Sequence, residues 1–132
     1  MKQLIQTAQF PELPGVYVVY ENAHDEQPLY VGMAGTQTLR KRWQVNHLYA
    51  RAGGSSLRRS LGLHLGLAKE KLERPERYYA PEIEAQITAF LASCWIEFEP
   101  TETAAEAQDL EARTIDKLGP LLNTARPATR ES

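Results

Sequence analysis

Two short runs of β-branched and aromatic residues, separated by a polar stretch, constrain the fold of this chain more than any other feature. The first run is Val16–Tyr20 and the second is Leu29–Gly32. Side chains of this kind are enriched in β-strands, whereas the intervening residues 21–28 contain Asn, Asp and Pro, which favour loops. Two such strands joined by a short polar loop predict an antiparallel hairpin.

The residues after the hairpin show helix patterns. We expect one helix from Leu39 to about Tyr49 and a second that Ser55 or Ser56 caps. A serine at this position can accept a hydrogen bond from a free backbone amide of the first turn. A third helix is expected to begin at Pro81, because proline fits the first helical position.

The last third of the chain predicts one more strand and one more helix. Trp95–Glu99 alternates apolar and acidic residues, as a half-buried strand does. Thr103 and Glu106 have the spacing of a capping box, and the helix that they begin is expected to stop at Gly119. The fold class is therefore α+β, with a small three-stranded, mainly antiparallel sheet flanked by helices. The order is β-β-α-α-β-α with an extra helix.

The length of 132 residues suits a single domain, with its core at about residues 15–123 and a frayed tail at 124–132. No apolar run approaches the ~18 residues of a membrane span, and the N-terminus lacks the apolar stretch of a secretory signal. The single cysteine, Cys94, excludes an intramolecular disulfide framework and a multi-cysteine zinc site. A reducing, cytoplasmic location is expected, with no membrane partner.

The net charge of −2 conceals an uneven distribution of charge. No acidic residue occurs between Gln27 and Lys69. This stretch contains the basic residues Arg40, Lys41, Arg42, Arg51, Arg58, Arg59 and Lys69. A basic face of this kind is typical of proteins that bind a phosphate backbone, although a solvated helix face that balances acid elsewhere is the alternative.

One acidic residue of the last helix is expected to face the core. At about 100° per residue, Glu111 falls within the same arc as Leu110, Ile115 and Leu118. A carboxylate in such a place must be paired, bind a metal, or change its pKa. A structural Glu–Arg ion pair and a functional site both satisfy this requirement.

The order of these residues resembles the GIY-YIG nuclease superfamily. Its two signature tripeptides are similar to Gly15-Val16-Tyr17 and Tyr30-Val31-Gly32, with valine in place of isoleucine. The helix of the family's essential arginine is similar to Leu39-Arg40-Lys41-Arg42-Trp43. Glu111 and Asn123 resemble the metal-binding glutamate and a late, site-supporting asparagine. The resemblance spans about residues 15–123. This part of the chain is similar to the GIY-YIG domain of nucleotide-excision-repair incision subunits.

The resemblance implies a metal-dependent endonuclease that hydrolyses phosphodiester bonds in DNA. Glu111 would hold one Mg²⁺ or Mn²⁺ ion, and Arg42 would bind the non-bridging oxygens of the phosphate. Tyr17 or Tyr30 would position or deprotonate the attacking water. A tyrosine with its usual pKa of about 10 acts as a base only if a cation, such as Arg42 or the metal, lowers that pKa. Asn123 would support the site without ionising.

Two departures from the family pattern concern the chemistry. Relatives commonly have lysine directly after the second tripeptide, where this chain has Met33. The family often places histidine or tyrosine one turn after the arginine, whereas here Asn46 occupies that position and His47 follows it. We expect His47 to enter the site, because its imidazole can titrate near neutral pH. A histidine that packs at the helix edge beside Trp43 is the alternative.

The basic residues near the arginine are then expected to contact DNA phosphates. These residues are Arg40, Lys41, Arg51, Arg58 and Arg59. Such contacts position a duplex without reading its sequence. A catalytically weak or inactive DNA-binding module of the same fold is the main alternative, and a protein–protein module is a third. The choice of DNA would come from residues 51–80, a targeting partner or a homodimer.

Overall fold

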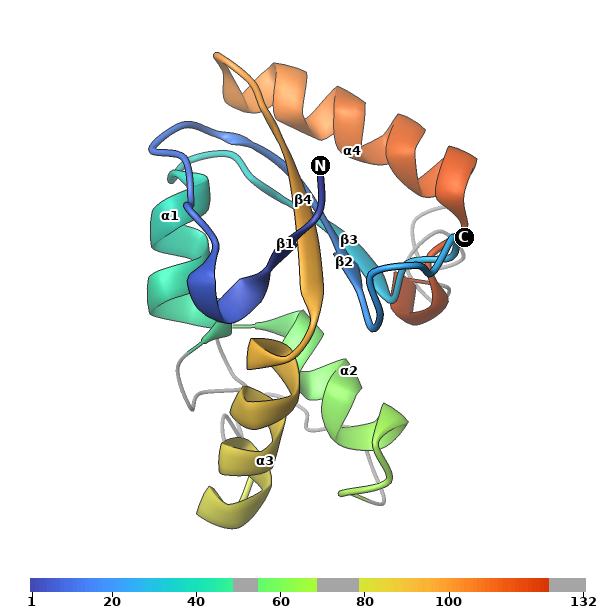
Figure 1. Cartoon of the computed structure of the whole chain (residues 1–132). Coiled ribbons are helices and arrows are strands. Elements are labelled where there is room, and N and C mark those ends of the chain that lie inside the picture. The colour runs from blue at the N-terminus through green and yellow to red at the C-terminus, as the bar shows by residue number, and fades with distance from the viewer. Residues whose placement is uncertain (49–54, 69–78, 124–132) are drawn as a thin grey trace, which may run out of the picture.

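The centre of the protein is an antiparallel sheet, seen in a computed structural model that describes residues 1–48, 55–68 and 79–123 (Figure 1). Its strands are β1 (Gln3–Leu4), β2 (Gly15–Tyr20), β3 (Tyr30–Ala34) and β4 (Trp95–Pro100), in the order β1-β4-β2-β3. The predicted hairpin is β2 and β3, whose register pairs Tyr17 with Gly32. The α+β fold class is confirmed. The described sheet also contains β1, a two-residue strand that the sequence patterns did not predict.

The helices begin at the predicted local signals, and α4 also ends where predicted. They are α1 (Leu39–Lys41), α2 (Ser56–His64), α3 (Pro81–Ala92) and α4 (Ala104–Leu118), with short 3₁₀ turns η1 (Ile5–Thr7) and η4 (Leu121–Asn123). Ser55 caps α2 by accepting a hydrogen bond from the backbone N–H of Arg58 at 3.1 Å. Thr103 and Glu106 form the predicted capping box of α4, and Gly119 ends α4 in the left-handed region at a φ of 57°.

The first helix changes its winding at Arg42. α1 continues directly into a stretch of π-helix, η2 (Arg42–His47). The backbone N–H of Leu48 donates to the carbonyl of Trp43 at 3.0 Å, a step of five residues. A π-helical turn therefore brings residue i+5, rather than i+4, beneath residue i.

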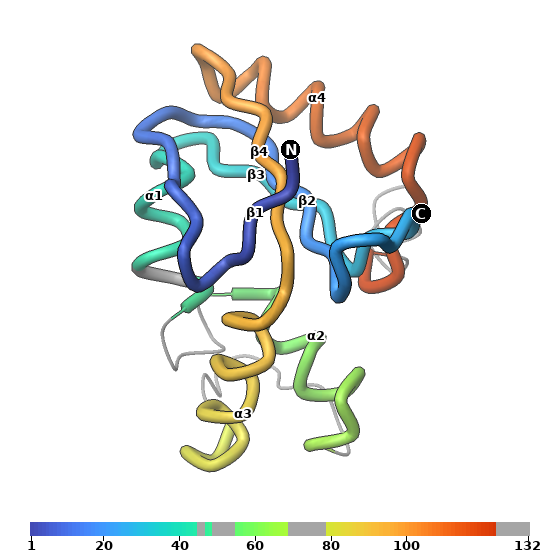
Figure 2. Tube along the Cα trace, in the orientation of Figure 1, coloured from blue at the N-terminus to red at the C-terminus, as the bar shows by residue number. Residues whose placement is uncertain are grey.

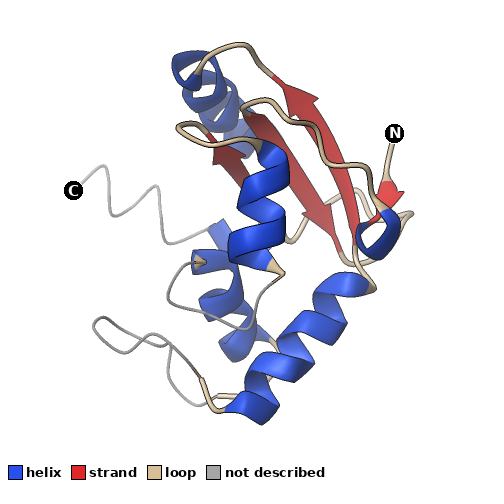
Figure 3. Ribbon diagram, turned by 90° about the vertical axis from the view of Figure 1, so that its left-hand side faces the viewer, coloured by secondary structure: helices blue, strands red, loops and turns tan. Residues whose placement is uncertain are grey.

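Helices cover both faces of the sheet (Figures 1 and 3). β2 is buried along its whole length, so its side chains alternate between two cores. Tyr17 and Val19 face the larger core, which holds side chains from α1, α2 and α3. Val16 and Val18 face a smaller core beneath α4, where they pack with Ile115. The sheet therefore packs α1, α2 and α3 against one face and α4 against the other.

The chain returns to the hairpin after α4 and pairs with the residues just before β3 (Figure 2). The backbone N–H groups of Leu121 and Leu122 donate to the carbonyls of Pro28 and Leu29 at 3.1 and 2.7 Å. The segment therefore satisfies backbone carbonyls at the start of the outer strand of the hairpin. The expected tail at 124–132 lies outside the described residues. In the described parts of the chain, no helix is long and apolar enough to cross a membrane.

Candidate active site

A pocket of about 530 Å³ lies where β2, β3, η2, α2 and α4 meet. Its lining consists of Tyr17, Tyr30, Gly32, Met33, Arg42, Ser56, Gln108, Glu111 and Ala112. Four residues predicted for catalysis, namely Tyr17, Tyr30, Arg42 and Glu111, therefore share one pocket. They come from four different elements, so only the folded chain brings them together.

The glycine at the end of the second tripeptide makes room for the first tyrosine. A Cβ atom added to Gly32 would lie 2.3 Å from the hydroxyl oxygen of Tyr17 and 2.5 Å from its Cζ. Both distances are far shorter than van der Waals contact. The Tyr17 ring therefore lies directly over Gly32 on the neighbouring strand. This close approach requires glycine at position 32.

His47 contacts the hydroxyl of Tyr17 but does not line the pocket. Its Nε2 lies 2.5 Å from the Tyr17 oxygen, and its Nδ1 lies 2.6 Å from the hydroxyl oxygen of Ser55. The ring is fully buried and packs edge-on against Trp43, with ring centroids 4.7 Å apart. The five-residue step of η2 accounts for this placement, since it brings position 47 onto the side of the helix that bears Arg42.

Burial has the largest effect on the pKa values of Tyr17 and His47. Desolvation raises the pKa of Tyr17 well above its usual value. Tyr30 and Glu111 raise this pKa further, while the guanidinium of Arg42 and its hydrogen bond lower it. Desolvation also holds the pKa of His47 well below its usual value, and Arg42 and Arg58 add to this effect. At neutral pH Tyr17 is therefore a phenol and His47 a neutral imidazole. Arg42, one of the two cations expected to lower the pKa of Tyr17, does lower it, but burial outweighs this effect.

Tyr30 lies beside Tyr17 and has a different partner. The two rings are stacked, with centroids 6.2 Å apart and an interplanar angle of 27°. The Tyr30 hydroxyl is 2.8 Å from the hydroxyl of Ser56, the first residue of α2. The two tyrosines are thus connected to consecutive serines at the start of one helix, Tyr30 directly and Tyr17 through His47.

Glu111 is a buried carboxylate at the pocket wall, with 6% of its surface exposed. Gln108 lies one turn earlier on the same face of α4 and lines the same pocket. Within the described residues, no group of three or more His, Cys, Asp or Glu side chains is placed to hold a metal ion. One carboxylate with an amide oxygen nearby suits Mg²⁺ or Mn²⁺, which keep several waters, better than zinc, which prefers imidazole and thiolate ligands.

Asn123 lies behind the pocket and clamps the backbone of β3. Its Oδ1 accepts a hydrogen bond from the N–H of Val31 at 2.8 Å, and its Nδ2 donates to the carbonyl of Val31 at 2.9 Å. The side-chain amide therefore pairs with Val31 as a neighbouring strand would. Because Val31 lies between Tyr30 and Gly32, this contact holds the second tripeptide in place.

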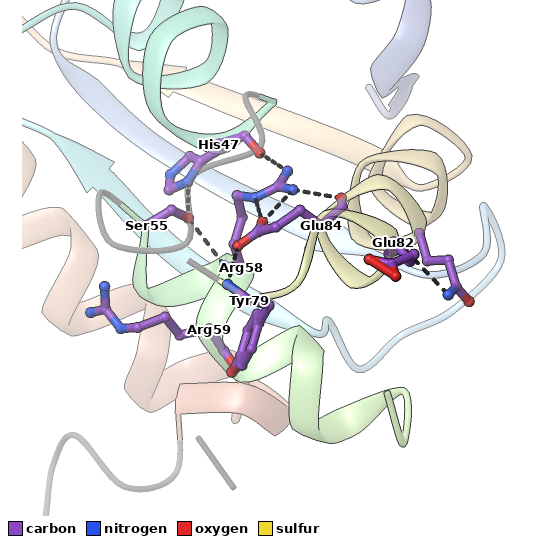
Figure 4. A network of polar contacts seen from close by, with 8 residues as sticks. His47, Ser55, Arg58, Arg59, Tyr79, Glu82 and Glu84 are labelled. Carbon is purple, nitrogen blue, oxygen red and sulfur yellow. Dashed lines mark hydrogen bonds and ion pairs between the residues drawn. The ribbon is translucent and has the colours of Figure 1, made fainter. Parts of the chain in front are cut away.

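Arg58 is a buried structural residue, and its expected contact with DNA phosphate is wrong. Its side chain has 0% exposure and donates to the carboxylate of Glu84 at 2.9 and 3.2 Å (Figure 4). It also donates to the backbone carbonyls of Glu84 and His47 at 2.8 and 2.9 Å. A guanidinium with all these partners inside the protein is not available to a nucleic acid.

The other residues expected to bind phosphate differ in their surroundings. Arg40 is about half exposed, forms an ion pair with Glu12 and donates to the carbonyl of Phe10. Lys41 is exposed and Arg59 is partly buried. Arg51 lies outside the described residues.

Several residues of the site did not emerge from the sequence patterns. Ser56 and Gln108 line the pocket, and Glu84 holds Arg58. Gln108 lies three residues before Glu111, so helical spacing alone places both on one face of the helix. In the same way, Glu84 lies three residues before Ile87 and shares its buried face. No pattern in the sequence distinguishes Ser56 from an ordinary residue of a first helical turn.

Comparisons with known proteins found one family model and two similar solved structures. A family model described as the GIY-YIG catalytic domain matches residues 2–131. No curated protein matches the chain significantly. Two similar solved structures are of the GIY-YIG N-terminal endonuclease domain of UvrC from Thermotoga maritima. One is bound to its catalytic divalent cation, magnesium, and is 25% identical, while the other is a point mutant at 23%. Each match covers 86% of both chains with a TM-score of 0.44.

Proposed function

Because this chain belongs to the GIY-YIG family, we propose that it is a metal-dependent endonuclease that hydrolyses phosphodiester bonds in DNA. The whole chain would act as one nuclease domain. One observation carries the proposal. The pocket holds two tyrosines, an arginine and a buried glutamate within the same wall, and these residues come from distant parts of the sequence. A folded chain has no structural need for such a set around an open pocket, since each polar group costs free energy to desolvate.

Each residue has a chemical task that suits its surroundings. Arg42 would bind the non-bridging oxygens of the phosphate, where its planar cation matches the charge that develops during attack. Glu111 would be the metal ligand, and a divalent ion bound there would act as a Lewis acid on the phosphate oxygens. Asn123 would act as a positioning residue through the backbone of Val31.

The tyrosines would place the attacking water between them. Tyr17 holds its proton in the protein alone, because burial raises its pKa. It can take up a proton from water only after the charge of a bound cation favours the phenolate. His47 contacts the Tyr17 hydroxyl directly, so we assign it to the hydrogen-bonding of that tyrosine rather than to direct contact with DNA.

Basic residues of α1 and α2 would position the duplex. We retain Lys41, Arg59 and Arg40 as proposed phosphate contacts, and Arg40 would have to exchange its ion pair with Glu12 for a phosphate. Arg51 is proposed on its sequence position alone. The open side of the pocket continues into a second hollow lined by Gly35, Thr36 and the start of α4, which shares Met33, Arg42 and Gln108 with the first. A DNA strand would cross both.

A DNA-binding module without nuclease activity is the second candidate. It is favoured by the high pKa of Tyr17 and by Met33, which lines the pocket where relatives commonly carry lysine. The two candidates differ in what happens when DNA and metal are supplied together.

The test is an incubation of the purified protein with Mg²⁺ or Mn²⁺ and plain, nicked, branched or single-stranded DNA. The nuclease proposal predicts cleavage of at least one substrate, which is lost in Glu111→Ala and Arg42→Ala and on addition of EDTA. Matched variants at exposed acidic and basic positions, Asp109→Ala and Arg113→Ala, should cleave as the wild type does. Tight DNA binding without cleavage would support the inactive module, and neither binding nor cleavage would refute both.

A further inference from the structure

Either His47 or Tyr17 can be the donor of the hydrogen bond between them. His47 is neutral, so one ring nitrogen carries a proton and the other accepts one. Either the Tyr17 hydroxyl donates to Nε2 and Nδ1–H donates to Ser55, or the Ser55 hydroxyl donates to Nδ1 and Nε2–H donates to Tyr17. These two arrangements give the Tyr17 oxygen opposite roles.

Counting the protons at Ser55 distinguishes between them. The Ser55 oxygen already accepts from the backbone N–H of Arg58 at 3.1 Å, and its contact with Nδ1 of His47 is 2.6 Å (Figure 4). Ser55 is 1% exposed, and its hydroxyl makes no further hydrogen bond with the part of the chain that the structure describes. If Nδ1 carried the proton, the serine hydroxyl would be buried with its own proton unpaired among these residues, which costs free energy.

The opposite arrangement pairs the protons of Ser55 and His47 and leaves only the proton of Tyr17 to the pocket. The Ser55 hydroxyl donates to Nδ1, and Nε2–H donates to the Tyr17 oxygen. The Tyr17 hydroxyl proton is then free to face the pocket, which Tyr17 lines and which is open to solvent. We propose that Ser55 is a positioning residue that fixes the Nε2–H form of His47 and thereby directs this N–H group at the oxygen of Tyr17.

The proposal deepens the proposed nuclease function and rests on it for its consequence in catalysis. With Nε2–H fixed, the Tyr17 oxygen receives hydrogen bonds from His47 and from Arg42. Both lone pairs of that oxygen then accept hydrogen bonds, and its own proton lies on the pocket side, where the attacking water would be. Two donors aimed at one oxygen favour negative charge on it, so the arrangement prepares Tyr17 to exchange a proton with that water.

Neighbouring contacts hold Ser55 in place. Arg58, three residues later, donates to the backbone carbonyl of His47 and is itself bound by Glu84 of α3. The backbone N–H of Tyr79 donates to the other oxygen of Glu84 at 2.8 Å. This buried network joins η2, α2 and α3 behind the pocket, so the distance between Ser55 and His47 is set by packed elements (Figure 4).

The first test is an NMR measurement of the His47 ring in the wild-type protein. A long-range ¹H–¹⁵N correlation spectrum identifies which ring nitrogen carries the proton, and the chain has only three histidines to assign. We expect a neutral ring protonated at Nε2 at neutral pH. A ring protonated at Nδ1, or at both nitrogens, overturns the proposal without reference to any nuclease activity.

The second test compares variants that separate donation from helix capping. Ser55→Ala removes both, so we expect the Nε2–H form to lose its dominance and single-turnover cleavage to fall about tenfold with unchanged DNA affinity. Ser55→Thr keeps both and should restore the ring signal and the rate. Thr103→Ala removes an equivalent cap, with the same 3.1 Å contact, at α4. It should leave the His47 ring signal as in the wild type.

Three outcomes count against the proposal. An unchanged Nε2–H signal in Ser55→Ala overturns it, because Ser55 then does not fix the ring. A shifted ring signal in Thr103→Ala also overturns it, because the ring would then respond to the loss of a helix cap rather than to the loss of donation. A shifted signal with a wild-type cleavage rate overturns the catalytic consequence. If the wild type cleaves no DNA at all, the nuclease function fails, while the spectrum still decides the role of Ser55. Should Ser55→Ala fail to fold, the wild type and Ser55→Thr still give that decision.

Discussion

Substitution of Gly32 by alanine is expected to damage both the stability and the activity of this protein. The new methyl group would lie 2.3 Å from the Tyr17 oxygen and 2.5 Å from its Cζ, so the tyrosine ring must move. The ring is 1% exposed and packs edge-on against Trp43, with ring centroids 5.2 Å apart. The space it would need is therefore already filled.

The magnitude follows from three contributions. Insertion of a methyl group into a packed site costs about 1–3 kcal/mol, and the displaced hydroxyl loses its hydrogen bond to His47, about 1 kcal/mol. Alanine also restricts the unfolded chain, which offsets roughly 0.4–1 kcal/mol. We expect a net loss of about 1–3 kcal/mol in the free energy of unfolding. A displacement of the reacting groups by about 1 Å lowers catalysis about 100-fold.

The assay is urea unfolding followed by circular dichroism, with cleavage measured on the same preparations. Gly35→Ala is a matched control for stability, because its methyl group would approach the terminal Cε of Met33 at 2.7 Å, a side chain that can move, and would otherwise meet Ala104 at an ordinary 3.4 Å. We expect this control to lose less than about 0.5 kcal/mol. If Gly32→Ala kept the stability and the cleavage rate of the wild type, the placement of Tyr17 over Gly32 would be refuted.

Three further predictions test the surroundings of the site. Glu84→Gln leaves the buried guanidinium of Arg58 without its counter-charge and should lower the free energy of unfolding by about 3 kcal/mol in chemical denaturation, whereas Asp109→Asn, at an exposed ion pair, should change it little. The pKa of His47 is lower in the folded than in the unfolded protein, so its contribution to stability is present above about pH 6.5 and is lost as the pH falls toward the folded-state pKa. The free energy of unfolding should fall by about 1.4 kcal/mol per pH unit below pH 6.5, and His47→Gln should remove this pH dependence. An equal pH dependence in the variant would contradict the lowered pKa. Asn123→Asp cannot donate to the carbonyl of Val31 and should lose about 2 kcal/mol, and wild-type stability would show that the clamp on β3 is unimportant.

The local features of the fold could be predicted because their causes lie within a few residues. The hairpin follows from two runs of strand-forming side chains, and the starts of α2 and α4 follow from Ser55 and Thr103 as caps. The inward direction of Glu111 follows from helical periodicity alone. In each case the determining residues are neighbours in the sequence.

The parts of the site that could not be predicted depend on contacts between distant residues. Arg58 follows a helix cap, as an exposed basic residue often does, and only Glu84, 26 residues away, shows that it is buried. The π-helical step that brings His47 to Tyr17 adds one residue to a turn, and spacing alone could not choose between positions 46 and 47. The high pKa of Tyr17 depends on how deeply the folded chain buries it.

The central claim is that Glu111 holds the metal that makes this pocket a nuclease site. The most direct test titrates Mn²⁺ into the wild-type protein and into Glu111→Gln, with bound Mn²⁺ measured by electron paramagnetic resonance and DNA cleavage measured on the same samples. We predict that one ion binds to the wild type, that cleavage rises in parallel with its occupancy, and that both are lost in a Glu111→Gln protein that remains folded. Cleavage at the wild-type rate by Glu111→Gln, or cleavage by the wild type without bound metal, would contradict the claim.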